Sequence, residues 1–266
     1  MNNLVFGKYI PIDSLIHRLD PRAKMICLFL LIIAIFIPDS FYAFIPIALI
    51  LFIALLLAKI GIKMIVQSFK PMIFMMLFLL LINCLTIKTG NLLISIKSFE
   101  IYSDAISNSM FVVVRLLLMI SVTTLLTATT KPLDLTLAIE WLLKPFELIK
   151  LPTHEIAMMI SIALRFIPTI IEETLRIMNA QKSRGVDFEN GTISSKISAL
   201  LSLIVPLFSV AFERAYELAD AMDARGYIPG AKRTRYHVLK FRFSDFIIIF
   251  ICLILVGTSI VSRIYL

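Results

Sequence analysis

Residues 170–185 read IIEETLRIMNAQKSRG, and residues 211–226 read AFERAYELADAMDARG. The two segments align without gaps at an offset of 41 residues, so that Arg184 corresponds to Arg225. Each is the end of a helical pattern, and a repeated helix end predicts two equivalent contacts with a partner. The patterns stop at related tripeptides, Ser183-Arg184-Gly185 and Ala224-Arg225-Gly226.

Both segments have the periodicity of amphipathic helices. The first apolar stripe comprises Ile167, Ile171, Leu175 and Met178, and the second comprises Phe208, Phe212, Ala215, Ala219 and Met222. Glycine ends a helix without a Cβ penalty, and arginine in the last turn suits the helix dipole. A guanidinium group also binds a carboxylate through two parallel hydrogen bonds. The Arg-Gly ends are therefore either helix caps alone or caps that also dock a partner.

The composition is that of a membrane protein. Of the 266 residues, 59% are hydrophobic and 17% charged, with a mean hydropathy of +0.95. The net charge of +8 comes from basic residues interspersed with apolar runs, which argues against a nucleic-acid-binding face. The three cysteines lie in separate apolar runs and the three histidines share no ligand spacing, so we expect neither disulfides nor a metal site.

We predict an all-α polytopic membrane protein with about five transmembrane helices. Asp20 is a suitable N-cap and Pro21 a suitable first helical residue, so a helix should begin there. Pro71 is expected to start the third span. Gly90-Asn91 and nearby β-branched residues allow a short extended segment or hairpin in the loop at 88–104. The predicted spans are 25–37 with the turn before it, 41–58, 71–87, 105–128 and 246–261.

The distribution of basic residues predicts the orientation. With these spans, 22 of the 26 lysines and arginines fall on one side of the membrane. Positive residues are enriched in cytoplasmic loops. The N-terminus is therefore expected in the cytoplasm and the C-terminus outside.

Two further apolar runs, 156–171 and 197–212, are not predicted to cross the membrane. If both crossed, the basic connection between them would be external, against the charge rule. Each run is also only 16 residues long, and Pro168 and Pro206 should bend it. We place them in the cytoplasm or at the inner interface, where such apolar helices need a partner.

Arg115 lies inside the predicted fourth span. A charge there costs about 2.5 to 3.5 kcal/mol on insertion scales, so it should face protein and bond Asn83, a threonine such as Thr123, or a carbonyl at a helix end. A role in transport is the alternative. Lys232, Arg233, Arg235, Lys240 and Arg242 form a basic stretch, interpreted as an interfacial elbow on anionic lipid.

Over essentially its whole length the chain resembles the transmembrane T component of energy-coupling factor transporters (EcfT). The residues that carry the resemblance are Leu19-Asp20-Pro21-Arg22, Thr129-Thr130-Lys131-Pro132-Leu133-Asp134-Leu135 with Ala138 and Glu140, Arg165-Phe166-Ile167-Pro168, and the two Arg-Gly ends. The first end in this family is commonly Ala-Arg-Gly, so Ser183 is a small departure.

The resemblance implies a scaffold that couples two ABC-type ATPases to a membrane-embedded substrate-binding S component for vitamin or micronutrient uptake in the bacterial cell membrane. It divides the chain into transmembrane helices at 1–130, a cytoplasmic coupling-helix region at 131–243 and a last transmembrane helix at 244–266. The ATPases would dock on Ser183, Arg184, Gly185, Ala224, Arg225 and Gly226. Structural or coupling roles would fall to Asp20, Pro21, Arg22, Arg115, Pro132, Asp134, Arg165, Pro168 and Pro206.

We expect no catalytic residue and no directly bound cofactor, with ATP and magnesium held by the partner ATPases. The sequence contains no Gly-x-x-x-x-Gly-Lys-Ser/Thr phosphate loop, in agreement with this division of labour. A secondary transporter and a self-contained substrate-binding membrane protein remain the alternatives. A membrane enzyme is disfavoured, because the sequence presents no constellation of carboxylates, histidines or cysteines.

Overall fold

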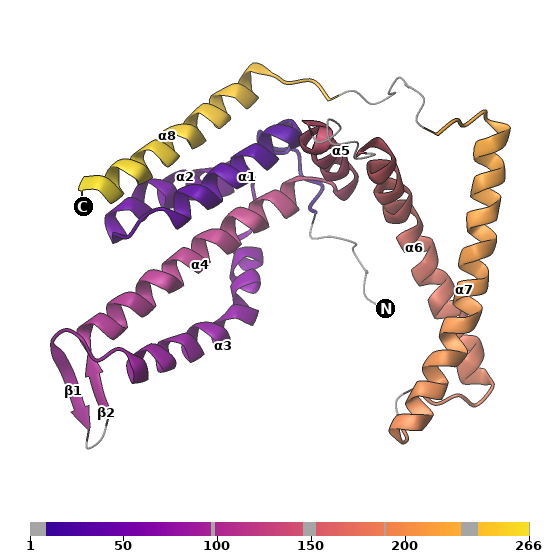
Figure 1. The fold of residues 1–266 in the computed structure, drawn as a ribbon, viewed down its shortest axis with the longest axis horizontal. Helices are drawn as coiled ribbons and strands as arrows, with labels where there is room; N and C mark the ends of the chain where they lie inside the picture. The colour runs from indigo at the N-terminus through magenta and orange to yellow at the C-terminus, as the bar shows by residue number, and fades with distance from the viewer. Residues whose placement is uncertain (1–8, 97–98, 146–152, 189, 230–238, 266) are drawn as a thin grey trace. The chain divides into compact units, whose positions relative to one another are not determined.

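The computed structural model describes residues 9–96, 99–145, 153–188, 190–229 and 239–265. The chain forms two compact units, one from residues 1–138 and 238–266 and the other from 139–237. Helix α5 contributes residues to both. The elements are α1 (Pro21–Phe36), a 3-10 helix (Phe41–Ala43), α2 (Phe44–Leu57), α3 (Ile62–Thr86), β1 (Leu92–Ile96), β2 (Phe99–Tyr102), α4 (Ser103–Thr129), α5 (Pro132–Leu143), α6 (Thr153–Ser183), α7 (Ile193–Ala224) and α8 (Phe243–Tyr265) (Figure 1).

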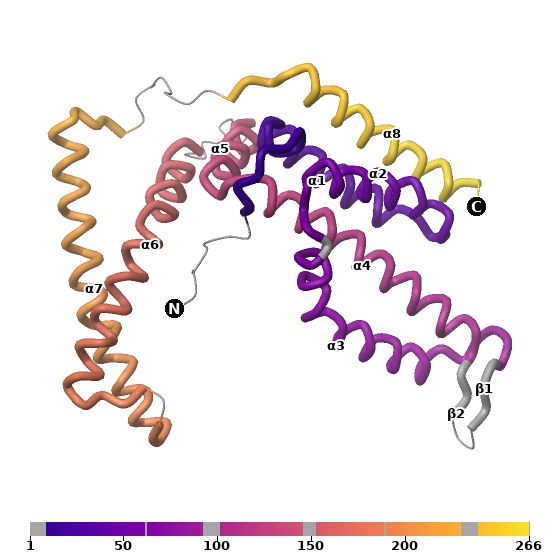
Figure 2. The backbone as a smooth tube through the Cα atoms, turned by 180° about the vertical axis from the view of Figure 1, so that it is seen from behind, coloured from indigo at the N-terminus to yellow at the C-terminus, as the bar shows by residue number. Residues whose placement is uncertain are grey.

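The core of the first unit lies among α1, α2, α4 and α8. Ile35 of α1 and Ile47 of α2 are fully buried in it, and Val122 of α4 and Leu255 of α8 complete the contact. Helix α8 packs along α1, and α3 packs along α4 (Figure 2). Large apolar side chains also point outward, as expected of helices surrounded by lipid; Phe74 of α3 is 79% exposed.

Among the described residues, five helices are long and apolar enough to cross a membrane: α3, α4, α6, α7 and α8. The chain is thus a multi-pass membrane protein, as predicted, but this set differs from the predicted one. Helices α1 and α2 are shorter, and the 16 residues of α1 span only about 24 Å. The prediction that α6 and α7 are too short was wrong, because polar turns extend them to 31 and 32 residues. Their exclusion as spans now depends on the charge rule alone.

Helix α3 also corrects the prediction. It begins at Ile62, not at Pro71, so that Lys63 and Lys70 lie within the helix. An internal proline removes one backbone hydrogen bond and bends a helix without having to end it. Figure 1 shows α3 bending partway along its length. Pro168 and Pro206 likewise lie inside the continuous helices α6 and α7.

A β-hairpin joins α3 to α4, in agreement with the turn signals in that loop. Strands β1 and β2 are antiparallel, with Leu92 opposite Tyr102 and an irregularity between Leu92 and Ile94. The Asn91 carbonyl accepts a hydrogen bond from the Ser103 amide at 2.9 Å, and the Asn91 amide donates to the Ser103 hydroxyl at 3.1 Å. The hairpin is therefore closed at the first residue of α4.

Gly90→Ala should destabilise this closure by roughly 1 to 3 kcal/mol. Gly90 has a φ of +93°, and an added Cβ would lie 2.6 Å from the Ser103 hydroxyl oxygen. Thermal unfolding in detergent measures the effect. Gly257→Ala on α8 is the matched control, because a Cβ there meets nothing within 4 Å and alanine is the better helix former. Equal melting temperatures for the two variants would contradict the prediction.

Candidate docking and coupling sites

Helix α6 ends in a Schellman motif built around Gly185. The Val186 amide donates to the Gln181 carbonyl at 3.1 Å, and the Gly185 amide donates to the Lys182 carbonyl at 3.0 Å. Gly185 has a φ of +86°, the left-handed conformation that this motif needs. Arg184 is thereby fixed as the last residue before the chain turns away from the helix.

Helix α7 ends in the same geometry at Gly226. The Tyr227 amide donates to the Met222 carbonyl at 3.0 Å, and the Gly226 amide donates to the Asp223 carbonyl at 2.9 Å. The φ of Gly226 is +71°. The predicted glycine caps are therefore confirmed, and the sequence repeat of 41 residues is a repeat of structure.

The two tripeptides are exposed, both at Ser183-Arg184-Gly185 and at Ala224-Arg225-Gly226. Neither the Arg184 nor the Arg225 guanidinium has a hydrogen bond or ion pair within the part of the chain that the structure describes. The caps use only backbone groups of these arginines. The cap hydrogen bonds do not involve the guanidinium groups, whose charge suits the helix dipole, and both groups remain exposed.

Helix α7 also carries an exposed apolar face. Four of the five residues of the predicted stripe of this helix are exposed, and Met222 is half-buried. Phe208 and Phe212 are 60% and 61% exposed and stack on each other with ring centroids 6.3 Å apart. The predicted stripe of α6 is better covered, since Ile167, Ile171 and Met178 are half-buried.

The N-terminus of α1 is joined to the N-terminus of α8 through two aspartates. Asp20 caps α1 as predicted, because its Oδ1 accepts from the Arg22 amide at 2.8 Å. Asp245, which is fully buried, accepts from the Asp20 amide at 3.0 Å and from the Arg242 amide at 2.6 Å. In a capping box, an acidic residue in the first turn binds the N-cap amide of its own helix. Asp245 binds the N-cap amide of its own helix, at Arg242, and also the N-cap amide of α1, at Asp20.

Lys24 makes a second connection from the same turn of α1. Its Nζ donates to the Thr129 carbonyl at 2.8 Å and to the His17 carbonyl at 3.3 Å, and its side chain is buried. Thr129 is the last residue of α4. The first turn of α1 thus holds the end of α4 as well as the start of α8.

His17 fastens the segment that precedes α1. Its Nε2 lies 3.1 Å from the Ile10 carbonyl and its Nδ1 lies 2.7 Å from the Ser14 hydroxyl. Burial lowers the pKa of His17 below its ordinary value of 6.5. The neutral ring suits these two contacts, because one nitrogen donates to the carbonyl while the other accepts from the hydroxyl.

The docking of this segment should therefore weaken on acidification. With a folded-state pKa below 6.5, the released segment binds protons more readily than the docked one, so stability falls as the pH drops below about 6.5. Hydrogen-exchange protection of the Leu19 amide, which donates to the Ile16 carbonyl, should decrease between about pH 7.5 and pH 5.5. His17→Gln should abolish this pH dependence, and the same dependence in that variant would contradict the assignment.

Arg115 is paired with protein, and its partner is the helix-end carbonyl. The Nη2 atom donates to the Pro38 carbonyl at 2.8 Å, just beyond the end of α1. The guanidinium also lies over the Phe111 ring at 4.8 Å and the Phe36 ring at 5.9 Å. Asn83 binds the Ser109 hydroxyl instead.

The other predicted residues are dispersed over both units. Pro132 is the first residue of α5 and Asp134 lies in its first turn, while Arg22 lies over the Phe241 ring at 5.9 Å. Arg165 is exposed on α6. Of the basic stretch, residues 232, 233 and 235 lie outside the described residues, and Lys240 and Arg242 are exposed.

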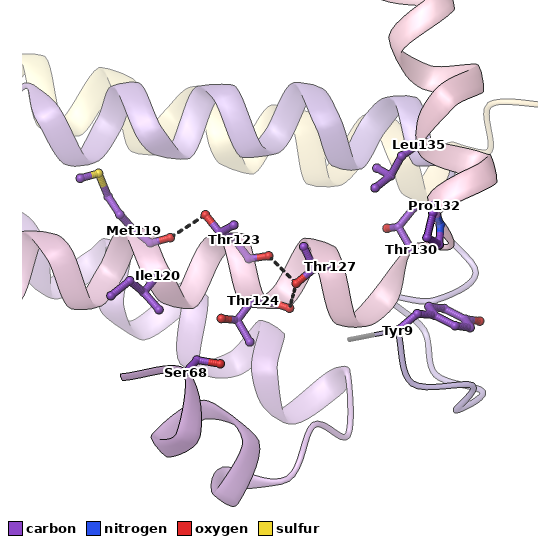
Figure 3. Close-up of a pocket in the computed structure, with 10 residues that line it drawn as sticks. All are labelled: Tyr9, Ser68, Met119, Ile120, Thr123, Thr124, Thr127, Thr130, Pro132 and Leu135. Atoms are coloured by element: carbon purple, nitrogen blue, oxygen red, sulfur yellow. Dashed lines mark hydrogen bonds between the residues drawn. The ribbon is translucent and has the colours of Figure 1, made fainter. Parts of the chain in front are cut away.

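A cavity of about 480 Å³ lies beside α4 (Figure 3). Two of its threonine hydroxyls bind the backbone of their own helix: Thr123 donates to the Met119 carbonyl, and Thr127 donates to the Thr123 carbonyl. Their donors are therefore already used within the helix. The lining residues are Tyr9, Ser68, Met119, Ile120, Thr123, Thr124, Thr127, Thr130, Pro132 and Leu135.

Sequence reasoning missed Asp245 and the role of Lys24. A first-turn acid before an apolar run is a recognisable capping signal, so Asp245 could have been assigned to the start of α8. Its second partner could not, because Asp20 lies 225 residues away. In the sequence, Lys24 contributes only to the count of basic residues on the side predicted to be cytoplasmic.

Comparison with known proteins identifies relatives of this chain. The family described as cobalt transport protein (CbiQ) matches residues 13–237. The energy-coupling factor transporter transmembrane protein EcfT of Bacillus subtilis is 41% identical over 245 residues, which is 92% of each chain. This chain belongs to the EcfT family. The EcfT proteins of Streptococcus thermophilus and Staphylococcus aureus are each 42% identical, with 92% of this chain covered and 93% and 91% of theirs.

Membership of the EcfT family establishes the general role of this chain. EcfT-family chains are transmembrane components of energy-coupling factor transporters, and this chain is therefore part of a multi-subunit transporter. The matched region includes the cap of α1, the end of α4 and both Arg-Gly ends.

Proposed function

We propose that this chain is the non-catalytic coupling subunit of its transporter and that Arg184 and Arg225 each dock one ABC-type ATPase. The observation that carries the proposal is the pair of matching Schellman ends, each presenting an exposed arginine without an intramolecular partner in the described residues. A planar guanidinium at a rigid turn suits a carboxylate in a groove of the partner.

Helices α6 and α7 would transmit the movement. ATP binding brings the two ATPases together, and this displaces the two helix ends that they hold. The exposed apolar face of α7, which includes Phe208 and Phe212, is suited to contact with a membrane-embedded S component. The S component would bind the vitamin or metal ion, and ATP with magnesium would stay in the ATPases.

The orientation that fits this function has the N-terminus and both Arg-Gly ends in the cytoplasm and the C-terminus outside. It is supported by the distribution of lysine and arginine. A secondary transporter would use intramembrane charges for ion binding. The pairing of Arg115 with the Pro38 carbonyl disfavours that alternative.

Co-purification from membranes tests the proposal. The chain should bring down two ATPases and an S component, and the complex should hydrolyse ATP. Transport by this chain alone, without ATPases, would contradict it.

A further inference from the structure

The covalent connections between the two units begin and end near one point of the first unit. The chain leaves this unit through α4 and the start of α5 and returns to it ahead of α8. The end of α4 and the start of α8 are both bonded to the first turn of α1. Any pull from residues 139–237 on these connections therefore acts on that turn.

The bonds at this turn are suited to carry load. Lys24 and Asp245 are charged and buried, and each donates to or accepts from backbone atoms of elements distant in sequence. Hydrogen bonds to charged groups are about twice as strong as neutral ones, and a buried group that loses its partner is costly. Breaking the bonds at the first turn of α1 therefore has a high free-energy cost.

Resting on the proposed function, we infer that Asp20, Lys24 and Asp245 form a clasp that keeps α4 and α8 fastened to α1 while the ATPases move the coupling helices. Lys24 and Asp245 are positioning residues. With the clasp intact, movement of residues 139–237 reaches the first unit as a whole. With it opened, each ATP cycle separates α8 from α1 instead.

Two native cysteines report on this separation. Cys27 of α1 and Cys252 of α8 are both buried in the core to which these two packed helices contribute. Each lies seven residues after its clasp aspartate, so the two helices stay paired in the same register. N-ethylmaleimide reacts with thiolates that reach water, and its reaction with these cysteines measures opening of the α1–α8 contact.

The experiment uses the full complex with its ATPases and S component, and Cys84→Ser leaves Cys27 and Cys252 as the two thiols of this chain, on which labelling is measured. Asp245→Asn and Lys24→Met are compared with the unsubstituted chain, without nucleotide and during ATP turnover. In either variant, N-ethylmaleimide should label Cys27 and Cys252 roughly tenfold faster during turnover than without nucleotide. Loss of one charge-assisted hydrogen bond is large enough to change the equilibrium by this factor. In the chain with an intact clasp, the two cysteines should react slowly both without nucleotide and during ATP turnover.

Asp39→Asn is the matched control, because the Asp39–Arg263 pair joins the other end of α8 to the α1–α2 turn at 3.3 Å. It should not make labelling depend on ATP.

Labelling of the clasp variants that is equal with and without ATP would make the clasp merely structural and overturn the inference. If ATPases failed to bind even the Cys84→Ser chain, the proposed function would fall and the clasp with it. Normal binding and hydrolysis without ATP-dependent labelling would overturn the clasp alone.

Discussion

Replacing both Arg184 and Arg225 with glutamate should release the ATPases from the purified complex while the chain stays inserted in the membrane. Each guanidinium is exposed, and glutamate would place a negative charge where we propose a partner carboxylate. Removing one partner of a buried charge pair costs roughly 2 to 5 kcal/mol, much of it from leaving the other charge unpaired. Either single variant should therefore weaken binding, and the double variant should abolish it.

The caps make this experiment specific. Both Schellman motifs use backbone amides and carbonyls, so glutamate at either position leaves the helix end intact apart from a small unfavourable dipole term. Arg176→Glu is the control, because Arg176 is a 78% exposed arginine of α6 that pairs only weakly with Glu173 at 3.5 Å. Recovery of both ATPases with the double variant, at the level of this control, would reduce the Arg-Gly ends to caps.

Local signals in the sequence predicted the helix ends well. An Asp-Pro pair specifies an N-cap and a first helical residue within two positions, and α1 begins there. Arg-Gly specifies a left-handed C-cap in the same way, and both Gly185 and Gly226 have this conformation. An extended segment after α3 was predicted from Gly90-Asn91 and the β-branched residues that follow, and β1 begins directly after Asn91. Each of these features depends on neighbouring residues.

Predictions that depended on where an apolar run stops were less accurate. Pro71 predicts a helix start, but α3 runs through it. The polar turns that lengthen α6 and α7 have good helix formers but little hydrophobicity, so counting apolar residues underestimated both helices. Hydropathy measures suitability for lipid, and a helix that continues past the apolar run is not detected by it.

The clasp was beyond sequence reasoning for a different reason. Its bonds join the start of α1 to residues more than 100 positions away, and the acceptor for Lys24 is a backbone carbonyl that every residue possesses. No residue type marks such a partner. The sequence marks Asp20 as an N-cap and as part of the resemblance to EcfT, but its contact with Asp245 is made by its backbone amide.

Arg115→Met should destabilise the first unit by about 1 to 3 kcal/mol while leaving ATP-driven uptake per folded complex unchanged. The substitution leaves the Pro38 carbonyl without the donor that now lies 2.8 Å away, in a residue that is fully buried. It also removes the cation–π contacts with Phe111 and Phe36. Methionine fills much of the same volume, so the loss reflects polar contacts more than a cavity.

Arg115→Lys separates the two roles considered for this residue. Lysine keeps the charge but not the planar group that binds the carbonyl and stacks on the rings, so it should recover only part of the stability. Thermal unfolding in detergent gives the stability, and uptake by reconstituted transporter, normalised to folded complex, gives the function. Normal stability with lost uptake in the methionine variant, restored by lysine, would assign Arg115 to transport. The Pro38 contact predicts the reverse, with stability lost and uptake kept.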